Sequence, residues 1–182
     1  MTVAHAAHNS AFRRALNAKV TVITHVPTDE ALDIVVCSRM LAQGTIAVPT
    51  LTMMEGVVNN LKPPGRSYAT ARNSVQAMHT AGVTILAGTD SNMQKGVPAN
   101  VMHGESMHHE LELLVDAGLT TLEALKSATS LPANYFGLGD RGIIAVGKRA
   151  DLLLLTEDPI ADIKATRSIQ KVWCKGVEVE GV

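Results

Sequence analysis

Short apolar runs alternate along the chain with longer stretches in which apolar residues recur every three or four positions. The short runs are rich in valine, isoleucine and threonine, which favours β-strands, whereas the longer stretches have the period of amphipathic helices. Strands are expected at residues 2–5, 20–24, 45–48 and 83–87. The second of these is apolar enough to be buried on both faces, as parallel strands are. The pattern predicts an α/β fold of four strand–helix units.

Helix signals lie between the expected strands. We expect helices at residues 9–18, 29–43 and 67–81, and another that carries Met107 to Val115. Thr28 or Asp29 is the expected cap of the second helix, which should end at Gly44. Residues 51–66 contain Pro63-Pro64-Gly65 and are expected to form a long loop with some helix of its own.

The C-terminal part has a different pattern. Thr120 and Glu123 have the spacing of a capping box, in which each side chain bonds a free backbone amide at the start of a helix. Residues 150–156 and 169–179 predict strands of a small β-layer. We therefore expect the four strand–helix units and the C-terminal helices over residues 1–140 and a β appendage over residues 141–182.

Composition narrows the possible partners. Sixteen basic and seventeen acidic residues give a net charge of -1, and no basic run is present. We therefore expect no nucleic-acid partner. No apolar stretch reaches the roughly 20 residues that span a bilayer, so we expect no membrane partner and a cytoplasmic location. Cys37 and Cys174 lie too far apart for a metal-type pair, and Cys37 is expected in the core.

Three polar residues come directly after expected strands. His5 ends the first strand, His25 follows the second and Asp90 follows the fourth. In barrels, active sites collect at the carboxyl ends of the strands, so these side chains are expected to converge. Two imidazoles and a carboxylate are ligand types that suit zinc. The alternative to a metal site is that the histidines at the strand ends are structural and that Asp90 caps a turn by bonding nearby backbone amides.

Other histidines are weaker candidates. His8 is expected to contact substrate. Because it lies one turn into the helix that follows the first strand, the alternative is that its side chain only faces solvent. His103 belongs to a group with His108 and His109 after the loop that leaves Asp90, and one of the group could orient substrate or carry protons. Since His108 and His109 are adjacent on a helix, both cannot face one site. 

The chain resembles the amidohydrolase superfamily, and within it the imidazolonepropionase-like and prolidase-like branch. The strings that carry the resemblance are VAHAAHNSAFRRALNA, VTVITH, TILAGTDS, HHELELLVDAGLTTLEALKSAT and GKRADLLLLTEDPIADI. The resemblance implies a partial TIM-type (β/α) barrel equivalent to the fifth to eighth strands, followed by a remnant of a small β-sandwich. It implies that His5 and His25 are metal ligands, that Asp90 contacts metal and takes a proton from water, and that His103 lies near substrate.

The chain also departs from the family pattern. The family's His-x-His pair on the first strand and its bridging lysine on the fourth have no counterpart here. A site of two histidines and one aspartate, holding a divalent metal such as zinc, is what remains. Half a barrel also leaves open strand edges, so we expect a homo-oligomer in which the halves complete each other. Lys19 stands where a glycine would be expected at the end of a helix, a position that costs roughly 1 kcal/mol if the backbone is left-handed.

Three functions remain open at this point. The first is a metal-assisted hydrolase of a C–N bond, in an amide or cyclic amide, or of an ester bond in a small molecule, with Asp90 and His25 as catalytic groups. The second is a metal-independent acid–base enzyme, such as an isomerase, lyase or cyclase, that uses the same pocket. The third is a truncated remnant without catalysis.

Overall fold

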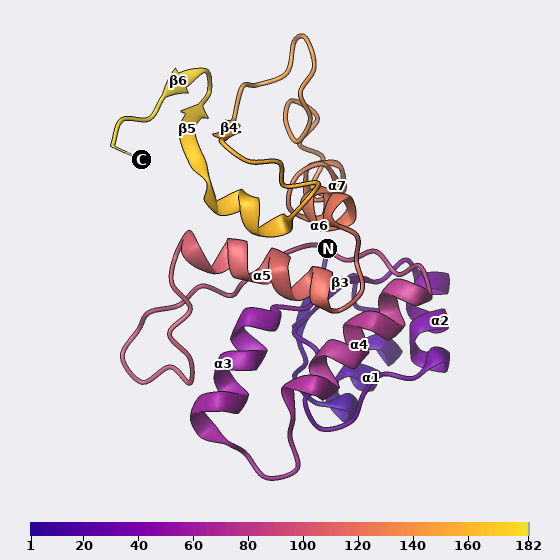
Figure 1. The fold of residues 1–182 in the computed structure, drawn as a ribbon. Coiled ribbons are helices and arrows are strands. Elements are labelled where there is room, and N and C mark those ends of the chain that lie inside the picture. Colours follow the sequence, from indigo (N-terminus) through magenta and orange to yellow (C-terminus); the bar gives the residue numbers. More distant parts are fainter. Residues whose placement is uncertain (182) are drawn as a thin grey trace. The chain divides into compact units, whose positions relative to one another are not determined.

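The computed structural model describes residues 1–181, and the chain forms two compact units that divide after Leu119. The division expected from the sequence lay at residue 140, between barrel and sandwich remnant. That assignment to family domains stays a prediction, and Val182, its last residue, lies outside the described part of the chain. Each unit is described by itself below (Figure 1).

A parallel sheet is the centre of the first unit. Strands β1 (Val3–His5), β2 (Val22–Thr24) and β3 (Ile46–Val48) are hydrogen-bonded in the order β1-β2-β3. The expected fourth strand reduces to a parallel bridge between Ile85 and Ala47. The α/β class is thus confirmed, but within residues 1–181 the parallel sheet has three strands and one added bridge, and it forms no closed barrel.

Helices cover this sheet and supply most of the core. They are α1 (Asn9–Asn17), α2 (Ile34–Gln43), α3 (Leu51–Leu61), α4 (Tyr68–Thr80) and α5 (Glu105–Asp116). Helix α4 packs against α2 and α3, and α5 packs against α3 and α4 (Figure 1). The buried side chains are mainly aliphatic residues and methionine, which fits the low aromatic content; the largest include Phe12, Leu16, Ile23, Met40, Leu51, Met78 and Leu114.

Two local expectations need correction. Within residues 51–66 the expected helix is present but takes up most of the segment, as α3, because the proline pair that suggested a loop begins only at Pro63. The cap of α2 is Asp33, whose side chain accepts a hydrogen bond from Val36 N at 2.8 Å. Neither of the expected caps serves α2: Thr28 is buried, and Asp29 bonds to α1 instead. 

Other local predictions from the sequence are confirmed. Helix α2 ends at Gly44 with φ 66°, the left-handed conformation that glycine adopts without steric cost. Lys19, after α1, has φ 55°, so the strained lysine expected there is present. Cys37 is fully buried, as expected, whereas Cys174 is exposed.

The second unit is a small helical and antiparallel β structure. Its elements are α6 (Thr121–Ala128), α7 (Ser130–Tyr135), β4 (Leu152–Leu155), the 3₁₀ helix η1 (Ile163–Arg167), β5 (Ile169–Cys174) and β6 (Val177–Glu178). The expected capping box of Thr120 and Glu123 is formed at the start of α6. Strand β5 pairs antiparallel with both β4 and β6, which confirms a β-layer. None of the helices among residues 1–181 is long and apolar enough to cross a bilayer.

Candidate active site at the strand ends

A pocket of about 160 Å³ opens at the carboxyl ends of the parallel strands. The residues that line it are Thr24, His25, Val48, Thr50, Gly88 and Asp90. They come from the ends of β2 and β3 and from the segment after the Ile85 bridge. The pocket therefore lies at the edge of the sheet where the sequence predicted the functional residues.

Three of the lining residues have a left-handed backbone. His25 has φ 67°, Thr50 has φ 51° and Asp90 has φ 53°. This conformation is uncommon for side chains with a Cβ, and for the β-branched Thr50 it is a genuine outlier. Such backbone strain persists only where the surroundings enforce it, and it is concentrated at functional sites. The sharp turns here follow directly on the strands and lie around one pocket.

His25 is the most constrained of these side chains. It is 4% exposed, and its Nδ1 atom lies 2.6 Å from Thr50 Oγ1. On the other side of the ring, Nε2 lies 3.9 Å from Asp90 Oδ2. Burial, and then the neighbouring His5, lower the pKa of His25 to about 4, against a smaller opposing effect of Asp90. The imidazole is therefore neutral at pH 7, which leaves one ring nitrogen as an acceptor or ligand.

His5 completes the group expected from the sequence. Its ring packs against the edge of His25, with centroids 4.1 Å apart and planes at 69°. By donor type, two imidazoles and the Asp90 carboxylate fit a zinc site, and a neutral His25 is the form that binds metal. Within residues 1–181, however, no three histidine, cysteine or acidic side chains are arranged as a ready metal-binding group. The pair of His25 and Asp90 is the part of the set that faces the pocket.

Gly88 explains how the Asp90 segment reaches this pocket. A Cβ atom placed on Gly88 would lie 2.5 Å from Val48 Cγ1, which is closer than any real contact. The missing side chain therefore lets residues 83–90 run against the end of β3. That close approach brings Gly88 and Asp90 to the lining of the pocket that Val48 and His25 also line.

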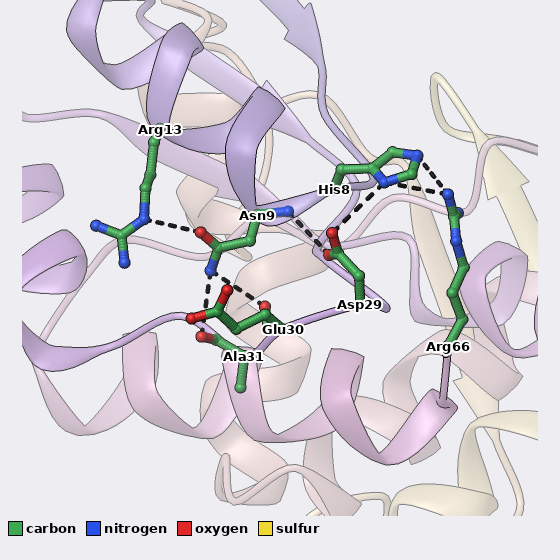
Figure 2. A network of polar contacts seen from close by, with 7 residues as sticks. All are labelled: His8, Asn9, Arg13, Asp29, Glu30, Ala31 and Arg66. Carbon is green, nitrogen blue, oxygen red and sulfur yellow. Dashed lines mark hydrogen bonds and ion pairs between the residues drawn. The ribbon is translucent and has the colours of Figure 1, made fainter. Parts of the chain in front are cut away.

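His8 lies in a separate polar network just beyond β1. Its Nδ1 atom lies 3.5 Å from Asp29 Oδ2 and 3.1 Å from Arg66 Nη2, and the guanidinium also contacts Nε2 (Figure 2). Asp29 Oδ1 accepts a hydrogen bond from Asn9 N at 2.9 Å. Burial raises the pKa of Asp29, but backbone hydrogen bonds, first that of Asn9, outweigh it and leave the pKa below its usual value. His8 is 49% exposed, so it can meet a ligand from solvent.

The later histidines do not line the pocket. His103 is exposed just before α5, and its role in substrate binding stays a prediction. His109 Nε2 lies 2.7 Å from Glu55 Oε2 and Nδ1 lies 3.5 Å from Glu112 Oε2. Burial alone would lower the pKa of His109, yet these two carboxylates raise it. 

Sequence reasoning missed two residues of this region, Thr50 and Arg66. Thr50 carried a usable signal, since it lies two positions after the third strand, as His25 lies one position after the second. Arg66 carried none, because its contact with His8 joins residues that are 58 positions apart.

Comparison with known proteins finds an imidazolonepropionase and an adenine deaminase among the proteins that resemble this chain. The chain is 30% identical over 148 residues to an imidazolonepropionase of Deinococcus deserti, an alignment that covers 77% of this chain and 32% of that protein. It is 37% identical over 70 residues to an adenine deaminase of Ligilactobacillus salivarius, covering 38% of this chain and 11% of that protein. 

A solved structure gives the same picture for the fold. A crystal structure of a Xaa-Pro dipeptidase with methionine bound in the active site superimposes on all of this chain and on 45% of that one, with a TM-score of 0.81 and 27% identity. The chain thus spans less than half the length of each of these three proteins. The amidohydrolase family model matches residues 1–179, and the chain therefore belongs to the amidohydrolase family.

Proposed function

We propose that this chain carries catalytic side chains of a metal-assisted hydrolase that cleaves a C–N bond, in an amide or cyclic amide, or an ester bond of a small molecule. The observation that supports this most is the distance of 3.9 Å between His25 Nε2 and Asp90 Oδ2 across an open pocket. Relatives named as a deaminase and a dipeptidase support a C–N bond as the target.

The three strand-end side chains have distinct roles in this proposal. His5, His25 and Asp90 would hold a divalent metal such as zinc, which supplies Lewis-acid activation of water when it is bound. Neutral His25 offers a ring nitrogen, and Thr50 holds the opposite nitrogen so that the ring cannot turn. Asp90 Oδ2 accepts the proton of the attacking water and returns it to the leaving group.

His8 and His103 are the proposed substrate contacts. Arg66 Nη2 bonds to His8, which also lies 3.5 Å from Asp29 Oδ2, so the rim at this point offers a guanidinium, an imidazole and a carboxylate to a ligand. His8 follows β1 by three positions, which puts it on the same rim as His5. 

The test is zinc binding and turnover by the purified chain, with His25→Ala, Asp90→Asn and His5→Ala as variants. We expect zinc to bind in a one-to-one ratio, and turnover of amide substrates to fall at least 100-fold in the first two variants, as for loss of a general base. The matched control is His79→Gln, since His79 is half-buried at the end of α4 that lies away from the strand ends. Activity that survives a chelator, together with no stoichiometric metal, would overturn this function.

A second candidate is a metal-independent acid–base enzyme such as an isomerase, lyase or cyclase. The observation in its favour is that His25 and Asp90 face each other as a pair, whereas no group of three metal ligands is assembled within residues 1–181. Turnover that resists chelators but requires Asp90 would favour this candidate over the hydrolase.

We also propose that copies of the chain associate. Strand β1 ends the sheet order β1-β2-β3, and Val3 on this strand is 58% exposed. An uncovered strand edge favours pairing with another strand. Light scattering coupled to size exclusion should give at least twice the monomer mass, and a stable monomer would contradict the proposal.

A further inference from the structure

Helix α3 begins in an unusual way directly beside the pocket. Its cap residue, Thr50, makes no side-chain bond to the helix, because Thr50 Oγ1 is bonded to His25 Nδ1. The first amides of α3 still need acceptors, since the first N–H groups of a helix have no partner within it. The acceptor comes from another element.

Glu110 of α5 supplies that acceptor. Its carboxylate accepts hydrogen bonds from Leu51 N at 2.9 Å, from Thr52 N at 2.8 Å and from Thr52 Oγ1 at 2.9 Å. Glu110 is 0% exposed, and buried carboxylates are rare because desolvation of the charge is costly. A threonine at the cap position can itself accept from the first amides of a helix, but here the Thr50 hydroxyl is bonded to His25 and Glu110 takes its place.

The same helix reaches the Asp90 segment. Ser106, one turn before Glu110 on α5, is 4% exposed, and its Oγ lies 3.0 Å from Ser91 Oγ. Ser91 Oγ in turn lies 2.6 Å from Thr89 Oγ1, so the two neighbours of Asp90 are tied to each other and to α5. One face of α5 therefore contacts the turn behind His25 and the turn that carries Asp90.

We propose that Glu110 and Ser106 are positioning residues, which fix His25 and Asp90 toward each other from α5. Glu110 holds the start of α3 so that the Thr50 hydroxyl stays on His25 Nδ1 and Nε2 faces Asp90. Ser106 holds the hydroxyl pair that flanks Asp90. The proposal rests on the roles given to His25 and Asp90 above, but its first test requires neither metal nor turnover.

That test is the tautomer of His25, read from the ¹⁵N shifts of its two ring nitrogens by NMR above pH 7. Because the acceptor Asp90 Oδ2 lies on the Nε2 side, the tautomer with hydrogen on Nε2 is expected in the wild type, with the Thr50 hydroxyl donating to Nδ1. In Glu110→Ala both nitrogens should move toward the averaged shifts of a free imidazole, as they should in Thr50→Val. Asp116→Asn is the matched control, because this acid on α5 bonds to Arg72, away from the pocket. An unchanged tautomer in folded Glu110→Ala would overturn the role of Glu110.

Zinc affinity of the metal-free chain gives an independent measurement. Groups that orient a metal ligand typically contribute about 10- to 100-fold to affinity, and we expect a loss of that size in Glu110→Ala and a smaller one in Ser106→Ala. Ser127→Ala is the control for Ser106, since Ser127 is equally buried but lies on α6. 

The conservative variant keeps the proposal testable if Glu110→Ala does not fold. Glu110→Gln retains one acceptor for the α3 amides, so we expect it to keep the wild-type tautomer and to lose only part of the zinc affinity. A scrambled tautomer in Glu110→Gln, or affinities equal to wild type in both the glutamine and Ser106→Ala variants, would overturn the proposal. If the wild type binds no zinc, the metal-assisted function fails, while the tautomer measurement still decides the role of Glu110.

Discussion

Helices α1 and α3 both begin on a carboxylate that another part of the chain supplies. Asn9 N donates to Asp29 at the start of α1, and Leu51 N donates to Glu110 at the start of α3, each at 2.9 Å. We refer to these as the outer cap and the inner cap. In both, the residue before the helix is also engaged by a polar side chain, His8 with Asp29 and Thr50 with His25. 

The two caps differ in solvent access, and this reverses their electrostatics. Asp29 is 34% exposed, so hydrogen bonds outweigh burial and the pKa of its carboxyl falls. Glu110 has three donors, but complete burial raises its pKa to about 7. Similar hydrogen bonds thus accompany opposite pKa shifts, because desolvation dominates only where water is excluded. The outer cap is a stabilising device, whereas the inner cap is costly and lies behind the pocket.

The largest expected difference is in the cost of removing each carboxylate. Glu110→Ala should lower the free energy of unfolding by about 3 kcal/mol, because it leaves buried amides of α3 without acceptors. Asp29→Ala should cost only about 1 kcal/mol, as for loss of an exposed helix cap. Urea unfolding followed by circular dichroism measures both, and equal losses would remove the distinction between the caps.

The pH dependence of stability should have opposite signs at the two caps. The pKa of Glu110 is raised from 4.5 to about 7, so its contribution is fully present below pH 4.5 and is lost as pH rises toward about 7. The difference in unfolding free energy between wild type and Glu110→Gln should fall by roughly 3 kcal/mol over that range. 

The outer cap gives the converse measurement. Because the pKa of Asp29 is lowered, its contribution is present above the usual value of 3.8 and is lost as pH falls below it. The difference between wild type and Asp29→Asn should therefore shrink in acid and stay flat near neutral pH. A flat Glu110→Gln difference between pH 4.5 and 7 would show that Glu110 is ionised at no electrostatic cost.

The smallest effect concerns the far ends of the same two helices, where the caps play no part. Lys19 after α1 and Lys62 after α3 have φ 55° and 43°. Lys19→Gly and Lys62→Gly should each stabilise the chain by about 0.5 kcal/mol, since glycine removes the strain but is more flexible when unfolded. Thermal melts should show similar gains for both, with the His25 tautomer unchanged; a gain at one end only would mean that the helices differ there as well.

The inner cap also marks where sequence reasoning ends. His25 and Asp90 could be predicted because each directly follows an apolar strand, and a local pattern fixes their place on the sheet edge. Glu110 could not, since it lies in an amphipathic helix where a glutamate normally faces water, and its partners are 58 and 59 residues away. A side chain that is buried by residues far away in the sequence has no signal in its own local pattern.

The outer cap was missed for a related reason. Asp29 was expected to cap the helix that follows it. Helix α2 begins only at Ile34, so Asp33 caps it, and the Asp29 side chain accepts from Asn9 N at the start of α1 instead. The fourth strand expected at residues 83–87 is reduced to one bridge at Ile85, because the pairing of a strand depends on neighbours that the local pattern does not specify. 

The unequal burial of the two cysteines has a practical consequence. Burial raises the pKa of the Cys37 thiol to about 11, so at neutral pH it is neither accessible nor nucleophilic. Cys174 is exposed on β5. A maleimide dye should therefore label the native chain once, on the C-terminal unit, and a second label should enter only as the N-terminal unit opens, which lets the unfolding of each unit be followed separately without engineering a new thiol.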